Sequence, residues 1–130
     1  MLFRSVYGVA TVGGPAVVLR TVDDAESPSD ADDGFNKIGD RRFVRFSLPT
    51  TRDITITARS SNPNNPDVDF IVYRNGDFVR AATAGPPVDE TTTIEDAAAG
   101  DYVIDVYDCA NGCADPEGTS GDYNLTVTVN

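Results

Sequence analysis

Histidine and tryptophan are absent from this sequence, and Lys37 is its only lysine. Without histidine, the chain cannot form a Ser-His-Asp or Cys-His nucleophilic centre or a His-ligated metal site. A Ser-Lys pair would have to use Lys37, whose Asp-rich surroundings favour a charged, unreactive amine. Carboxylate pairs of the kind that glycosidases use can be drawn almost anywhere among 21 acidic residues, so such a pair indicates nothing. We therefore expect no catalytic residues and a protein that is not an enzyme.

Positive charge is also scarce, because the chain has 10 basic and 21 acidic residues, which give a net charge of −11. Such a surface repels nucleic-acid phosphates and anionic lipid headgroups, so we expect neither nucleic acid nor a membrane as a partner. It tolerates bound cations. An acid excess of this kind is equally typical of a salt-adapted or simply soluble surface.

Long apolar runs are missing as well. The segment 1–21 is largely apolar, but Gly13, Gly14 and Pro15 interrupt it and no small-x-small cleavage site follows. Its alternation through Val6 and Gly8 is more typical of a strand than of a signal peptide. No stretch is long enough to span a bilayer. We expect a piece of a longer secreted protein whose export signal lies elsewhere.

The length of 130 residues and the hydrophobic content of 40% fit one folded domain over 1–130. We divide it into an N-terminal strand or hairpin region (1–22), an acidic loop (23–40) and a core (41–130). In the core, apolar and polar residues alternate with the two-residue period of half-buried strands. Predicted inward-facing residues are Val44, Phe46, Leu48, Ile54, Ile56 and Ala58, with Thr55 and Thr57 facing outward.

Turn signals separate these runs at roughly ten-residue spacing. The clearest is Asn75-Gly76 between two β-rich runs, which predicts a hairpin with a type I′ turn. About eight or nine short strands of this kind, each with one polar face, predict an all-β fold, an antiparallel β-sandwich.

The tripeptide Gly-Asp-Tyr occurs twice, at Gly100 and at Gly121, and an alternating run follows each copy. Glycine permits the turn geometry, aspartate bonds to nearby backbone, and tyrosine begins the pleat with a large ring. The repeat predicts two late strands that begin in the same way.

A wider series of motifs includes these two copies. It runs through "GDRRFVRFSLP", "DITITA", "DVDFIVYRNGDFV", "TIEDAAAGDYVIDVYD" and "GDYNLTVTV". In this order the series resembles the bacterial pre-peptidase C-terminal domain, with its F-x-F strand, its D-x-D-aromatic strand and its closing Y-x-L-x-V strand. The resemblance extends from Glu26 to Val129.

The resemblance implies a jelly-roll-like β-sandwich that is not catalytic and is attached to secreted proteases and other exported enzymes. Relatives in clostridial collagenases bind collagen and calcium. We therefore expect an accessory domain of a secreted hydrolase, a peptidase in the first instance, that aids secretion, stability or substrate attachment. Its partner would be a catalytic domain in the same polypeptide, and its location extracellular or periplasmic in a bacterium. The alternatives are a stand-alone module that binds a polysaccharide or a collagen-like fibrous protein, and a stalk module of a surface protein.

Members of the family often begin with an acidic segment that binds calcium. The corresponding residues here are Glu26, Asp30, Asp32, Asp33 and Asp40, although the family's asparagine is missing. Calcium takes six to eight oxygen ligands in flexible geometry, which clustered carboxylates on a loop can supply. A solvated acidic linker explains the same residues. The second-choice ligands are Asp67 and Asp69, for which hydrogen bonds to a turn are the alternative.

Two further groups of residues complete the candidates. We predict a disulfide between Cys109 and Cys113, because an even number of cysteines in a secreted domain indicates disulfide bonds. A metal site with only two thiolates would need more soft ligands. Five aromatic side chains allow two interpretations. They form a ligand-binding face, or the tyrosines among them cap the core with their hydroxyl groups in water. The five side chains are Tyr73, Phe78, Tyr102, Tyr107 and Tyr123.

Overall fold

The computed structural model describes residues 7–21, 41–62, 67–84, 89–108 and 124–130, and within them the chain forms nine strands and no helix. The strands are β1 (Tyr7–Val9), β2 (Val17–Arg20), β3 (Arg41–Leu48), β4 (Arg52–Ser60), β5 (Val68–Arg74), β6 (Asp77–Ala82), β7 (Glu90–Ala97), β8 (Gly100–Asp108) and β9 (Asn124–Val129).

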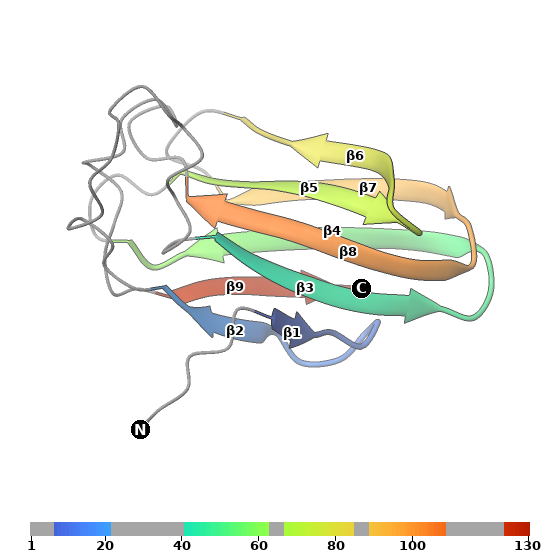
Figure 1. The fold of residues 1–130 in the computed structure, drawn as a ribbon, viewed down its shortest axis with the longest axis horizontal. Helices are drawn as coiled ribbons and strands as arrows, with labels where there is room; N and C mark the ends of the chain where they lie inside the picture. The colour runs from blue at the N-terminus through green and yellow to red at the C-terminus, as the bar shows by residue number, and fades with distance from the viewer. Residues whose placement is uncertain (1–6, 22–40, 63–66, 85–88, 109–123) are drawn as a thin grey trace.

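The strands form two sheets that overlie each other (Figure 1). The five-stranded sheet has the order β1-β3-β8-β5-β6 and the four-stranded sheet the order β2-β9-β4-β7. Every pairing is antiparallel except that of β1 with β3, which is parallel. The predicted all-β sandwich is confirmed, and the parallel edge pair is the one departure from a purely antiparallel arrangement.

The core lies between the sheets and is built by the alternation that the sequence shows. All six predicted inward-facing residues of β3 and β4 are buried, and the same holds for alternate residues of β8 and β9. On the opposite face of β4, Thr55 and Thr57 each form a cross-strand hydroxyl hydrogen bond to β7, to Thr93 at 3.0 Å and to Thr91 at 3.1 Å. The four-stranded sheet therefore has an apolar inner face and a threonine-rich outer face.

The two N-terminal strands flank a turn, as expected, but they do not pair with each other. After β1 the chain turns at Thr11–Gly14, where the Gly14 amide donates to the Thr11 carbonyl at 2.8 Å and Gly13 has a φ of 76°. This is the geometry of a type II turn. The Gly13 amide then donates to the Val129 carbonyl of β9. The segment thus crosses between the sheets, and β1 and β2 extend one sheet each instead of forming a hairpin.

The predicted type I′ turn between β5 and β6 is confirmed, since Asn75 and Gly76 have φ values of 49° and 88°. Gly100, which begins the first Gly-Asp-Tyr, has a φ of 146°. A Cβ atom at this position would lie 2.9 Å from Nε of Arg74, whose guanidinium donates two hydrogen bonds to the Ala99 carbonyl. Glycine is therefore required here by both backbone conformation and space. The second copy, at Gly121, lies outside the described residues.

Candidate functional site

Charged and aromatic side chains gather on the outer face of the five-stranded sheet, near the start of β3 and the end of β8. In the strand register Tyr107 lies opposite Arg41 on one side and opposite Asp69 on the other. The Arg41 guanidinium lies 4.7 Å from the centre of the Tyr107 ring and donates to Oδ2 of Asp105 at 3.0 Å. We call Arg41, Asp69, Asp105 and Tyr107 the outer-face cluster.

Burial dominates the electrostatics of the outer-face cluster. Asp69 and Asp105 are 8% and 6% exposed although they occupy outward-facing positions of their strands. Burial raises the pKa of Asp105, and the positive charge of Arg41 opposes that rise. Burial also raises the pKa of Tyr107, and the negative charge of Asp69 adds to it. Oδ1 of Asp105 is buried and has no hydrogen-bond partner among the described residues, where Arg41 is the main group that compensates this carboxylate.

The outer-face cluster does not by itself form a metal site. Among the described residues, no three acidic or cysteine side chains stand close enough together to hold a metal ion. The second-choice calcium ligands, Asp67 and Asp69, are both buried, at 4% and 8% exposure. A calcium ion there would need most of its six to eight oxygens from elsewhere.

The first-choice acidic residues and the cysteines lie outside the described residues. Calcium binding and the disulfide therefore stay predictions. The residues concerned are Glu26, Asp30, Asp32, Asp33, Asp40, Cys109 and Cys113, and the same holds for Tyr123.

The aromatic candidates separate into core and surface residues. Tyr102 is 1% exposed, stacks on Phe46 at 4.8 Å and donates its hydroxyl to the Ala98 carbonyl at 2.7 Å. The expectation of a hydroxyl in water is wrong for this tyrosine, because a backbone acceptor replaces water. Phe78 is 65% exposed and lies opposite Tyr73 across the β5–β6 pair.

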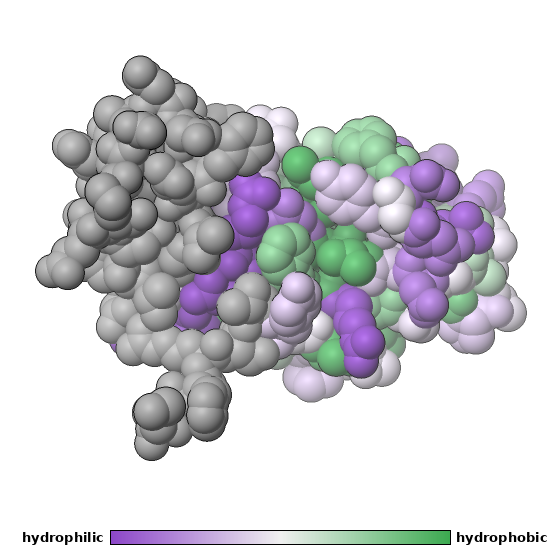
Figure 2. Space-filling model, in the orientation of Figure 1, coloured by the Kyte–Doolittle hydropathy of each residue, from purple (hydrophilic) through white to green (hydrophobic). Residues whose placement is uncertain are grey.

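One exposed aromatic pair was not among the sequence candidates. Tyr7 of β1 is 69% exposed and stacks on Phe43 of β3 at 5.5 Å between ring centres. The stack depends on the parallel pairing of β1 with β3, which no local pattern indicates. Over the five-stranded sheet, hydrophobic residues gather in the middle of the surface between hydrophilic ones (Figure 2).

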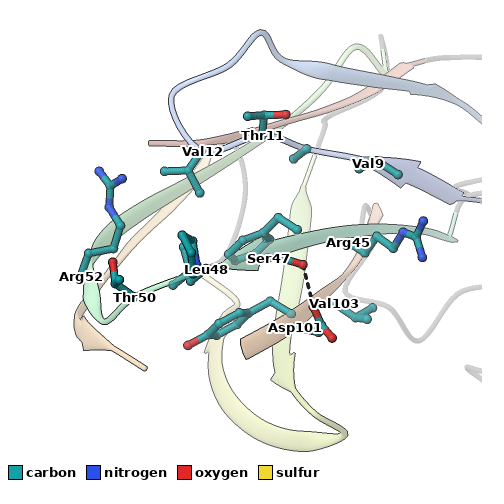
Figure 3. Close-up of a pocket in the computed structure, with 14 residues that line it drawn as sticks. Val9, Thr11, Val12, Arg45, Ser47, Leu48, Thr50, Arg52, Asp101 and Val103 are labelled. Atoms are coloured by element: carbon teal, nitrogen blue, oxygen red, sulfur yellow. Dashed lines mark hydrogen bonds between the residues drawn. The ribbon is translucent and has the colours of Figure 1, made fainter. Parts of the chain in front are cut away.

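A groove of about 890 Å³ opens at the edge of this sheet, where the chain leaves β1 (Figure 3). It lies between the departing segment Ala10–Val12 and the second half of β3. Its walls include Val12 and Leu48, and Arg45 and Arg52 lie toward its two ends. The Ser47 hydroxyl donates to Oδ1 of Asp101 at 2.6 Å on its rim. No sequence pattern indicated this groove.

Comparison with solved structures identifies the fold of the chain. No protein-family model matches the chain, and no curated protein matches it either. Among solved structures, it is similar to the pre-peptidase C-terminal domain of a collagenase from Bacillus anthracis, with 13% identity, a TM-score of 0.59, and coverage of 95% of this chain and 90% of that one. It is also similar to CorA, a surface-associated copper-binding protein of Methylomicrobium album BG8, with 10% identity, a TM-score of 0.61, and coverage of 95% and 96%.

At these identities the comparisons establish the fold. The resemblance to the pre-peptidase C-terminal domain, which the motif series predicted, is confirmed in that sense, because the same kind of small β-domain accounts for nearly the whole chain. None of the described residues belongs to a helix that is long and apolar enough to cross a membrane.

Proposed function

We propose that this chain is a non-catalytic accessory module of an exported hydrolase, in the first instance a peptidase, and that it aids secretion, stability or attachment to substrate. The observation that carries the proposal is the shared fold with a domain of a collagenase over 95% of the chain, which agrees with the five motifs in series. A catalytic domain in the same polypeptide and an extracellular or periplasmic location belong to the proposal.

The chemistry of the described residues supports a module that binds rather than one that reacts. Asp105 is engaged by Arg41, Asp101 by Ser47, and Asp108 by the Ser60 hydroxyl at 2.6 Å. These carboxylates act as hydrogen-bond acceptors within the fold. The exposed Tyr7 and Val9 on the five-stranded sheet instead suit contact with another surface.

Calcium belongs to the proposal as a structural ion. The described residues offer no cluster of ligands sufficient for it. The ligands would therefore have to come mainly from the acidic segment that contains Glu26, Asp30, Asp32, Asp33 and Asp40. Without calcium these carboxylates would repel one another, and a bound divalent cation reverses that repulsion.

The absence of catalysis is tested by assays of the purified chain against casein, a peptide ester and a glycoside. We expect no turnover above that of a buffer control with any of them. Turnover that is lost on substitution of a single acidic residue would overturn the proposal, since it would locate an active site in this chain.

A further inference from the structure

One wall of the groove is the part of the β3 edge beyond Arg45, which no described strand covers. The Ala10 amide donates to the Arg45 carbonyl at 2.9 Å, so the backbone of Arg45 faces β1. A strand directs its N–H and C=O groups to alternate sides with a two-residue period, so the backbone of Ser47 faces the same way. The pairing of β1 with β3 ends at Arg45, and no described strand continues it. Within the described part of the chain, no backbone group bonds to the N–H or C=O of Ser47 on this side, so both can bond to an added strand.

The walls beside this edge are apolar and shaped by the crossing of the chain between the sheets. Val12 lies across the groove from Leu48, and Val9 and Val103 extend the apolar surface on the outer face (Figure 3). Val9 is 64% exposed and Val103 39% exposed. An extended peptide whose backbone bonds to a sheet edge places alternate side chains on such surfaces.

The charges around the groove are the reverse of those of the whole chain. Arg45 and Arg52 are exposed and form no ion pair with any described residue. Asp101, the acidic residue of the groove lining, already accepts the Ser47 hydroxyl. On a chain with a net charge of −11, two uncompensated arginines at the two ends of one groove favour an acidic ligand.

We propose that this groove binds an extended acidic peptide segment of another protein, which adds to the free edge of β3 at Ser47, contacts Val12 and Leu48 with an apolar side chain and directs carboxylates toward Arg45 and Arg52. The inference rests on the proposed attachment role and names the kind of partner that role would use. Pro49 follows the edge directly and has no N–H, so the added segment is short.

The test is a titration of the isotope-labelled full chain with a blocked hexapeptide of alternating valine and glutamate, followed by amide chemical shifts and amide exchange. We expect binding that slows exchange of the Ser47 amide, and much weaker binding of the matching valine–lysine peptide. Unchanged exchange at Ser47 with a saturating peptide would overturn the proposal. So would a Ser47 amide already protected by self-association of the chain without peptide.

Variants separate the charges from the backbone. Arg45→Glu with Arg52→Glu should weaken binding of the glutamate peptide by about tenfold or more, since two favourable charge pairs become repulsive. Arg80→Glu is the matched control, because Arg80 is an exposed arginine on β6 at the opposite edge of the same sheet, and it should leave the affinity unchanged. Equal losses in both variants would contradict the groove as the site.

Two substitutions at Ser47 test the backbone contact. Ser47→Thr keeps both the N–H and the hydroxyl that Asp101 accepts and should retain binding, whereas Ser47→Pro removes the N–H and should abolish binding. If Ser47→Pro fails to fold, amide exchange at Ser47 in the unsubstituted chain decides the matter. Failure of the groove to bind peptide leaves the non-catalytic assignment intact, because that assignment depends on the hydrolase assays alone.

Discussion

The Arg41 guanidinium donates a hydrogen bond of 3.0 Å to Oδ2 of Asp105 across the pair formed by β3 and β8. The Asp105 side chain is only 9% exposed, whereas that of Arg41 is 31% exposed. The arginine thus compensates a carboxylate that lies on the outer face of a sheet and is nevertheless withdrawn from water. The stability of this part of the sheet should depend on that compensation.

Replacement of Arg41 by methionine should lower the free energy of unfolding by about 1–3 kcal/mol, because it leaves the buried Asp105 carboxylate without its charged partner. The matched control is Arg59→Met. Arg59 pairs with Asp89 at the same 3.0 Å distance, but with side chains that are 66% and 51% exposed. That change should cost no more than about 1 kcal/mol. Urea unfolding of the two variants measures the difference, and equal losses would contradict the role given to burial.

The stability of the protein should depend on pH through Asp105. Its pKa is raised in the folded state, mainly by burial, so the folded state binds a proton more readily than the unfolded state. The contribution of Asp105 to stability is then fully present below its unfolded pKa and is lost as the pH rises through its folded pKa. The stability of the native chain minus that of Asp105→Asn should therefore fall as the pH rises from acidic values to about pH 7. A difference that stays constant, or that rises with pH, would contradict the assignment.

Tyr107 should cause a second pH dependence at alkaline pH. Its pKa in the folded state is raised above that of a free tyrosine, first because of burial and then because of the charge of Asp69. The unfolded chain loses this proton at a lower pH than the folded chain, so the contribution of Tyr107 is lost as the pH rises through the folded pKa. The difference between absorbance titrations of the native chain and of Tyr107→Phe reports the ionisation of Tyr107. This ionisation should occur at a higher pH than that of a free tyrosine. A transition at the free-tyrosine pH would show that the ring is not in this environment.

The core-facing residues of the strands could be predicted from the sequence, because the alternation of apolar and polar residues along a strand indicates which of them face the core. Val44, Phe46 and Leu48 were identified in this way, and Asn75-Gly76 gave the turn because only a few residues accept two positive φ values. These signals are local. Each is complete within one strand or one turn.

Asp69 and Tyr107 were candidates from the sequence, but the outer-face cluster and the groove could not be predicted, because both depend on contacts between distant segments. Asp69 and Asp105 occupy outward positions of alternating strands, and the pattern predicts solvent exposure for such positions, yet both are buried. The groove exists only because the segment that follows β1 leaves the edge of β3 beyond Arg45 and crosses to β9. No sequence pattern near Ser47 indicates that the edge of β3 lacks a partner strand there among the described residues.

Calcium should raise the thermal stability of the chain through the acidic segment before Arg41. If its dissociation constant is about 10 µM, then about 1 mM calcium adds roughly 2.7 kcal/mol, or roughly 5–10 °C in melting temperature. Magnesium should do much less, because it demands a tight octahedron and gives up its water reluctantly. Thermal melts with chelator, calcium, magnesium and matched sodium chloride measure this. Equal shifts in all salts would indicate charge screening only, and a calcium shift that survives Asp30→Asn with Asp33→Asn would favour Asp67 and Asp69 as ligands.

The proposed accessory role in an exported hydrolase can be measured in the polypeptide that carries this chain. The measurement compares that polypeptide with and without residues 1–130, for turnover of a small soluble substrate and for the fraction of enzyme exported, retained activity after heating, and retention on an insoluble protein substrate. We expect unchanged turnover of the soluble substrate and a loss in at least one of the other three properties. Loss of soluble-substrate turnover by the correctly folded remainder, or no change in any property, would contradict it.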